Sequence, residues 1–401
     1  MELEINQNTA SKTISKRLAE VDWLELIYLV LFTAFVMKKY LESTALEWEL
    51  PSWYDTVVRG GIHAYILVRI YEQAVIKKAI QRKEIALMAL MIFTGEMITL
   101  YTGEIIISDT LLFIIGAKGV DFKKICFVYL CLAVSIQLVA LYLVNGGYVP
   151  DYVYGGGDRV RHSLGICYPT DFAAHILFIF MVYICFRGHK LTFFEISLML
   201  VGAFMVYKYT YARNDTVCIF ALCLLCIIVK LLSLKNIRLT KYKGMEVLSL
   251  GIVILFVICI CTTIFYNRDN EFMNKLNQIF SDRLNIGFNG YKRYGIHLFG
   301  SRVVEYGNGA GRITAAGFYF FLDSSYVRIV IKYGYIFAAM LSVMFGSMFI
   351  KIRRLGKDYI MVVLLVMLLF GVTEHHLFEL SFNPIWMVLF ANVPGKRCLK
   401  E

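Results

Sequence analysis

The sequence predicts an all-α integral membrane protein with about twelve transmembrane helices. Of its 401 residues 59% are hydrophobic and only 18% are charged, and the mean hydropathy is +0.64. A water-soluble domain cannot cover so much apolar surface with polar side chains. Apolar runs of roughly 20 residues, the length a helix needs to cross a bilayer, recur along nearly the whole chain. The lipid bilayer is therefore the expected surrounding.

We place the spans at 22–38, 53–74, 84–101, 104–117, 122–145, 169–186, 191–207, 214–234, 245–266, 323–350, 358–373 and 378–393. The second span carries Arg59 and Arg69, and the fourth is short and contains Asp109. Either could instead be an interfacial or re-entrant segment. The whole chain, 1–401, is interpreted as a single transmembrane domain.

Charge patterning predicts the orientation. More than half of the 41 Lys and Arg residues fall on one side when the N-terminus is cytoplasmic, in the segments 12–17, 77–83, 118–124, 187–190, 230–243, 351–357 and 396–400. Cytoplasmic loops of membrane proteins carry this excess. The pattern predicts a multi-pass protein of the cytoplasmic membrane, with both termini cytoplasmic and a retained first helix.

Several classes of function gain no support from the composition. The net charge of +11 reflects topology, because the basic residues are spread over many short loops, and we expect no nucleic-acid partner. The ten cysteines lie mostly in spans and indicate no disulfide framework. No cofactor is expected either.

Two outer loops are long. Residues 146–168 are rich in Gly and Tyr, and residues 267–322 form a long extracytoplasmic loop between spans nine and ten. Long loops in compact proteins usually carry function. In the second loop, Asn270 is expected to cap an amphipathic helix that runs to about Arg283 on the membrane surface.

Ionisable residues gather on the outer face. They are Arg159, Arg161 and His162; Asp171 and His175; Arg213; the segment from Arg283 to Asp323; and Glu374, His375, His376 and Glu379. Such groups at helix ends cost free energy unless they reach water or pair. Their convergence predicts a polar cavity that opens outward.

Each residue also has a simpler interpretation. Arg213 could belong to an interfacial aromatic belt, Arg283 could be a helix C-terminal cation, and Asp323 could be an N-cap. The Glu-His-His group lacks a His pair at i, i+4, so we expect no metal. Taken together, separated arginines on one face can hold a diphosphate bidentately, while a nearby carboxylate takes a proton from an attacking hydroxyl.

Five segments carry a family resemblance. They are RHSLG (161–165), LNQIFSDRL (276–284), YGIHLFG (294–300), LDSSY (322–326) and KYG (332–334). In order and spacing they resemble the Wzy-type capsule and exopolysaccharide repeat-unit polymerases of Gram-positive bacteria, which belong with the O-antigen ligases.

The resemblance implies an O-antigen ligase/polymerase-like, GT-C-type fold and an inverting, metal-independent glycosyltransferase. A growing glycan would pass from undecaprenyl diphosphate onto the non-reducing end of a lipid-linked repeat unit. Donor and acceptor would be undecaprenyl-diphosphate-linked oligosaccharides, and a flippase and a chain-length regulator are possible protein partners.

The resemblance also implies roles for individual residues. Arg213 and Arg283 correspond to diphosphate-binding arginines and Arg161 to the arginine of an earlier outer loop. His162 and Tyr326 are further substrate-binding candidates. Asp323 is the candidate base or acceptor-orienting group, and a second candidate is His297.

The chain departs from the family pattern at two places, Tyr168-Pro169-Thr170 and Ala212. An O-antigen-ligase-like transferase with a different acceptor is one alternative. A lipid-linked oligosaccharide flippase is another, but it should show two similar halves and charges deep inside its spans. A non-catalytic scaffold gives no reason for arginines in separate outer loops.

Overall fold

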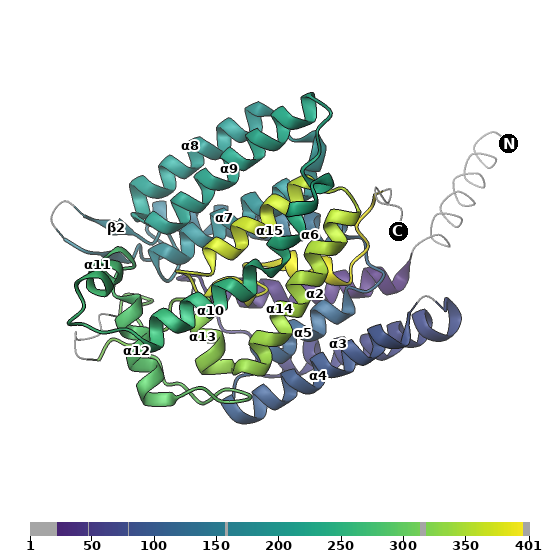
Figure 1. The fold of residues 1–401 in the computed structure, drawn as a ribbon, viewed down its shortest axis with the longest axis horizontal. Helices are drawn as coiled ribbons and strands as arrows, with labels where there is room; N and C mark the ends of the chain where they lie inside the picture. The colour runs from purple at the N-terminus through teal and green to yellow at the C-terminus, as the bar shows by residue number, and fades with distance from the viewer. Residues whose placement is uncertain (1–21, 47, 79, 157–158, 313–317, 396–401) are drawn as a thin grey trace.

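The computed structural model describes residues 22–395, apart from 47, 79, 157–158 and 313–317. The described chain is mostly helical, as predicted (Figure 1). Its α-helices are α2 (Trp23–Glu42), α3 (Trp53–Tyr71), α4 (Arg82–Thr102), α5 (Ile106–Gly116), α6 (Phe122–Asn145), α7 (Pro169–Arg187), α8 (Phe193–Thr210), α9 (Arg213–Leu234), α10 (Gly251–Ile264), α11 (Glu271–Ile279), α12 (Arg283–Tyr294), α13 (Ser325–Arg328), α14 (Tyr335–Arg354) and α15 (Asp358–Phe370).

The remaining elements are short. Strands β1 (Val153–Tyr154) and β2 (Arg161–His162) form an antiparallel pair in which Tyr154 lies opposite Arg161. The π-helical and 3₁₀ segments are η1 (Glu72–Ile76), η2 (Gly188–Lys190), η3 (Leu239–Lys241), η4 (Lys243–Leu250), η5 (Ile329–Tyr333), η6 (His376–Phe378) and η7 (Pro384–Leu389).

Seven helices of the described chain are long and apolar enough to cross a membrane. They are α4, α6, α7 with η2, α8, α9, α10 with part of η4, and α14. Helices α5 and α15 are apolar but shorter. The structure therefore has the helices of a multi-pass membrane protein, and the total of about twelve spans stays a prediction.

The second and fourth expected spans are both helices, α3 and α5. Helix α5 is buried along almost its whole length, so its shortness is compatible with a place inside the bundle. The ionisable residues that made these spans doubtful are all paired: Arg59 Nε lies 3.1 Å from Asp109 Oδ1, and Arg69 Nη1 lies 2.6 Å from Glu72 Oε2. Paired charges that face the protein interior are the usual way to keep such groups at membrane depth.

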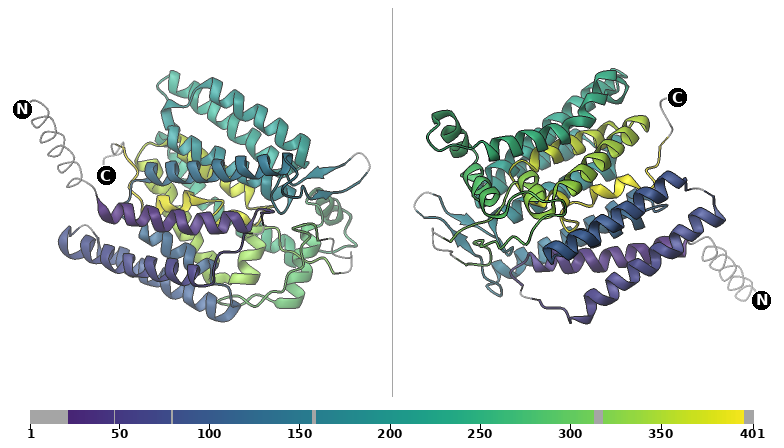
Figure 2. Two further views of the ribbon diagram at one scale, coloured as in Figure 1. Left: turned by 180° about the vertical axis from the view of Figure 1, so that it is seen from behind. Right: turned by 60° about the horizontal axis from the view of Figure 1, so that its bottom comes forward.

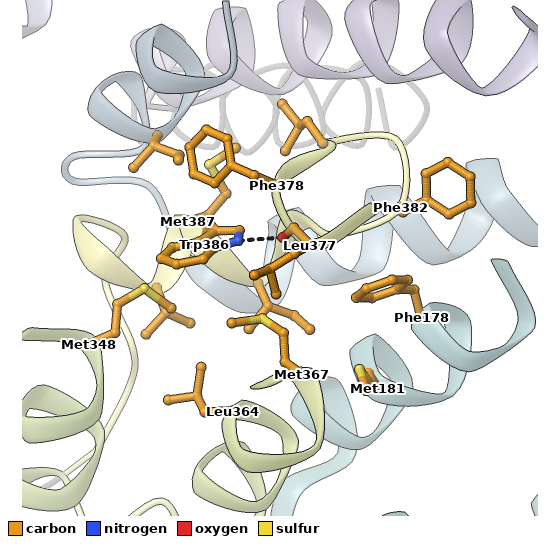
Figure 3. Packing of buried hydrophobic residues seen from close by; sticks show 14 of the residues in the cluster. Phe178, Met181, Met348, Leu364, Met367, Leu377, Phe378, Phe382, Trp386 and Met387 are labelled. Carbon is orange, nitrogen blue, oxygen red and sulfur yellow. Dashed lines mark hydrogen bonds between the residues drawn. The ribbon is translucent and has the colours of Figure 1, made fainter. Parts of the chain in front are cut away.

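The last expected span, 378–393, is wrong as a transmembrane helix. After Phe378 the segment contains one regular element, the short 3₁₀ helix η7. This helix begins at Pro384 and is capped by the Asn383 side chain. Proline lacks an N–H and disfavours α-helix in the preceding residue. The segment is instead buried inside the bundle, where the Trp386 indole donates to the Leu377 carbonyl at 2.8 Å (Figure 3). Non-helical backbone is tolerated at membrane depth only when it is buried in protein.

The tenth expected span, 323–350, is not one continuous helix. Helix α13 continues into η5 and stops at Gly334, and α14 begins at the next residue. Gly334 has a φ of +91°, and a Cβ added there would lie 2.3 Å from the Leu298 carbonyl oxygen. The outer loop thus packs directly against the break.

We expect Gly334→Ala to destabilise the fold by about 2 kcal/mol or more, because alanine is strained at positive φ and its Cβ has no room. Thermal unfolding in detergent measures the change. Gly346→Ala, in the middle of helix α14, is the matched control. A Cβ at Gly346 would meet only the Ser249 carbonyl oxygen, at an ordinary contact distance of 3.7 Å. Equal unfolding temperatures for the two variants would refute this account of the break.

The long outer loops lie at one end of the bundle and the ends of the described chain lie at the other. Both views in Figure 2 show this separation. Near the chain ends, the Glu25 side chain accepts the Asp121 N–H at 2.8 Å, and the backbone of Asp121 forms an isolated β-bridge with that of Asn392. This separation agrees with the predicted topology, and the assignment of one end to the cytoplasm stays a prediction.

The amphipathic helix expected after Asn270 is confirmed as α11. The Asn270 side chain accepts the Met273 N–H at 3.0 Å, and Phe272 and Ile279 are exposed on it. The expected end near Arg283 is wrong, because Ser281 and Asp282 adopt positive φ and end the helix earlier. Arg283 instead begins α12.

Candidate functional site

A cavity of about 690 Å³ opens at the end that carries the long loops. Four arginines from three separate parts of the chain line it: Arg159, Arg161, Arg213 and Arg283. Asp323 lines the same cavity. The structure thus brings together Arg161, Arg213, Arg283 and Asp323, which the sequence placed on one face.

The two long outer loops build one wall of this cavity. The Tyr154 hydroxyl donates to the Asn308 carbonyl at 2.8 Å and accepts the Gly311 N–H at 3.0 Å. The Ala310 N–H donates to the Cys167 carbonyl at 2.8 Å. These bonds join residues more than 140 positions apart, so neither loop forms its wall alone.

Two of the arginines are held by few protein contacts. Arg161 Nε donates to the Thr210 carbonyl at 3.0 Å, and its guanidinium lies 5.4 Å from the centre of the Tyr168 ring. Arg213, the first residue of α9, is exposed and donates to the Ser281 hydroxyl at 3.1 Å. A guanidinium has five N–H donors, so both side chains keep donors for a ligand.

Arg283 is held more tightly. Its Nε donates to the Thr373 carbonyl at 2.7 Å, and its Nη2 donates to Glu374 at 3.1 Å. Its Nε also lies 3.7 Å from Asp323 Oδ2. Burial alone would lower the pKa of Arg283, but Glu374 and Asp323 outweigh it and raise that pKa. Arg283 therefore stays charged while linking α12 to the turn after α15.

Three carboxyl groups face the arginines: Asp323, Glu374 and Asp215. Burial raises the pKa of Glu374 to about 7, against the opposing effect of Arg283. Burial raises the pKa of Asp323 as well. Asp215, in the first turn of α9, is fully buried, and neither of its carboxyl oxygens has a hydrogen-bond partner in the described chain. The cavity is thus a mixed site in which cations and proton-binding carboxyls lie close together.

Three residues selected from the sequence do not line the cavity. His162 pairs through Nδ1 with Asp151 at 2.6 Å, and His297 lies at hydrogen-bonding distance, 2.8 Å, from the Tyr294 carbonyl through Nε2. Tyr326 is fully buried, with its hydroxyl on the Leu368 carbonyl at 2.9 Å. The geometry gives all three structural contacts rather than access to a ligand in this cavity.

Of the Glu-His-His group and the following Glu379, only Glu374 lines the cavity; His375, His376 and Glu379 do not. His376 Nδ1 is 2.8 Å from Glu379, and its Nε2 is 3.3 Å from Asp171. Burial lowers the pKa of His376, but the two carboxylates outweigh it and raise that pKa to about 10. Nitrogen and oxygen atoms of His375, His376 and Glu379 lie within 4.8 Å of one another. A doubly protonated His376 has no lone pair for a metal, so the contacts favour an ion-paired imidazolium.

The sequence placed Arg159 and Glu374 among the outer-face ionisable residues but gave neither a role in binding or catalysis, and it did not single out Asp215. Glu374 follows an apolar run like any turn residue, and only the fold places it against Arg283. Asp215 lies in the first turn of α9, where an acid is ordinary. Its signal was available in Arg213-Asn214-Asp215, where a cation and an acid two residues apart open an apolar helix.

Comparisons with protein-family models, with curated proteins and with solved structures each give no match to this chain. Its function must therefore be argued from its own residues.

Proposed function

We propose that the chain is a polysaccharide polymerase on the outer face of a bacterial cytoplasmic membrane. It would transfer a growing glycan from undecaprenyl diphosphate onto a lipid-linked repeat unit. One observation carries the proposal: arginines from the β-hairpin loop, α9 and α12 line a single cavity together with Asp323. Several guanidinium groups on one cavity are suited to bind a diphosphate.

The chemistry needs no redox partner. The acceptor hydroxyl attacks the anomeric carbon of the donor glycan, so a glycosidic bond forms while the bond from that carbon to the diphosphate oxygen breaks. The diphosphate leaves on its lipid with the bonding electron pair, and the arginines stabilise the charge that develops on it. Attack from the opposite face inverts the anomeric centre.

Asp323 is the group that we assign to the acceptor proton. It lines the cavity and is more exposed than Glu374, with relative side-chain exposures of 21% and 3%. A base must reach the hydroxyl within hydrogen-bond distance, and the more exposed carboxylate is better placed to do so. Glu374 instead accepts a hydrogen bond from Arg283. Its protonation state therefore sets the net charge of the proposed diphosphate site.

Donor affinity should depend on pH through Glu374. Bound diphosphate adds negative charge beside Glu374 and raises its pKa further, so binding takes up a proton above pH 7. We expect the glycan-bearing undecaprenyl diphosphate donor to bind about tenfold more weakly at pH 8.5 than at pH 6. Calorimetric titration measures this change.

In Glu374→Gln the affinity should vary much less with pH, because the amide cannot ionise. Glu271→Gln, exposed on α11, is the matched control and should keep the wild-type dependence. A wild-type affinity that is constant across this range would contradict the role of Glu374.

The direct test of the proposal supplies purified protein with lipid-linked repeat units and a metal chelator. A polymerase produces a ladder of glycans that differ by one repeat unit. An O-antigen-ligase-like transferase would instead modify a different acceptor, and a flippase would make no new glycosidic bond.

A further inference from the structure

The opposite end of the bundle holds a second cavity, of about 190 Å³, which we call the basic pocket. It lies between the start of α6, the end of α7 with η2, the start of α15 and the segment 393–394. Its basic lining side chains are Lys123, Arg187, His189, Lys190 and Lys357, and no acidic residue lines it in the described chain. No residue lines both this pocket and the arginine-lined cavity at the other end.

The pocket has one basic and one apolar side. Phe122, Cys185 and Ile360 form part of its lining, and all of them are largely buried in the protein. Lys123 and Lys190 are exposed at its edge. A cavity with an apolar wall and a cationic rim is suited to bind an amphipathic molecule with an anionic group.

The surrounding surface is suited to acyl chains. Phe127 is four residues after Lys123 on α6 and therefore lies on the same helix face, where it is 54% exposed. Its ring lies 6.1 Å from that of Phe186, one residue before Arg187. A headgroup in the basic pocket would thus have its acyl chains over these rings, which a free phosphate would not use.

Helix α15 adds to the attraction for an anion. Its N-cap, Lys357, lines the pocket, whereas the acid of its first turn, Asp358, does not line it and accepts the Thr240 N–H at 2.9 Å. The N-terminus of a helix carries partial positive charge and favours anions. Arg187 is already paired with Glu195 at 2.7 Å, whereas Lys123 and Lys190 form no ion pair within the described chain, so these two lysines supply most of the uncompensated charge.

From this arrangement we propose that the basic pocket binds the headgroup of an anionic membrane phospholipid. Basic pockets between membrane helices on the cytoplasmic side are known to bind such headgroups. The inference does not depend on the proposed glycan transfer, and its test makes no use of that activity.

The test measures lipid binding to the full-length purified protein in detergent by native mass spectrometry and by the thermal unfolding temperature. The probes are phosphatidylglycerol, phosphatidylcholine with the same acyl chains, and inorganic phosphate. We expect phosphatidylglycerol alone to bind and to raise the unfolding temperature.

The double variant Lys123→Gln/Lys190→Gln should bind phosphatidylglycerol about 30-fold more weakly, because it loses two lysines at headgroup depth. Both lysines are exposed, so their replacement spares the core. Arg82→Gln/Lys83→Gln removes the same charge from exposed positions at the same end and should keep wild-type affinity. Equal losses in the two double variants would overturn the proposal, as would equal stabilisation by phosphatidylcholine or by phosphate.

Discussion

Replacing either Arg213 or Arg283 by alanine should lower polymer formation by at least about 100-fold, because in the proposed transfer each guanidinium would make charge-assisted hydrogen bonds to the leaving diphosphate. Single repeat units should accumulate on the lipid carrier in cells, and the variants should remain in the membrane. Glycan length on a gel measures the effect.

The two variants should differ in a second property. Arg213 is exposed, so its loss should leave the unfolding temperature unchanged. Arg283 bonds to Thr373 and Glu374, so its loss should also lower that temperature. Arg268→Ala is the matched control. Arg268 is exposed, lies in the same outer loop as Arg283 and donates to the Asn285 side chain. Normal chain lengths in both cavity variants would contradict the proposed mechanism.

Asp323→Asn should remove activity to a similar degree while sparing donor binding. The amide keeps the shape of the side chain but cannot accept the acceptor proton, and such a base contributes about 10²–10⁴-fold to rate. The turnover number should therefore fall without a loss of donor affinity, because the amide also removes a negative charge beside Arg283.

Asp269→Asn is the control for Asp323, because Asp269 is exposed in the same loop. If Asp323→Asn turned over normally, the base would be another carboxyl of the cavity. Glu374→Gln tested at constant pH would then become the deciding variant, because Glu374 lines the cavity and also contacts Arg283.

The parts of the fold that follow from local sequence were predictable. The apolar runs of α6 and α9 match their predicted spans within a residue, since length and hydropathy define such helices. The Asn270 cap was equally readable, because capping depends on neighbouring residues alone. Charge patterning separated the two ends of the bundle.

The parts that depend on tertiary packing were not predictable. The segment after Leu377 is as apolar as a span, but it fills the space between α7, α14 and α15 (Figure 3). Hydropathy cannot tell a segment buried in protein from one buried in lipid. The break at Gly334 likewise depends on the approach of the Leu298 backbone from the outer loop.

The candidate site shows the same division. Arg161, Arg213, Arg283 and Asp323 could be selected because their sidedness is readable from the sequence. His297 and Tyr326 lie close to those residues in sequence but not in the cavity, and Glu374 joins it only through folding. Nearness along the chain was therefore a poor guide within the long loop.

The most direct measurement follows both products of the proposed transfer at once. Purified protein receives donor lipid with one label on the glycan and another on the undecaprenyl diphosphate. Our account predicts that one free lipid diphosphate is released for each glycosidic bond formed, and that Arg213→Ala and Arg283→Ala lower both products together, by at least about 100-fold. Glycan that stays on its original lipid, with no lipid diphosphate released by the wild type, would contradict it.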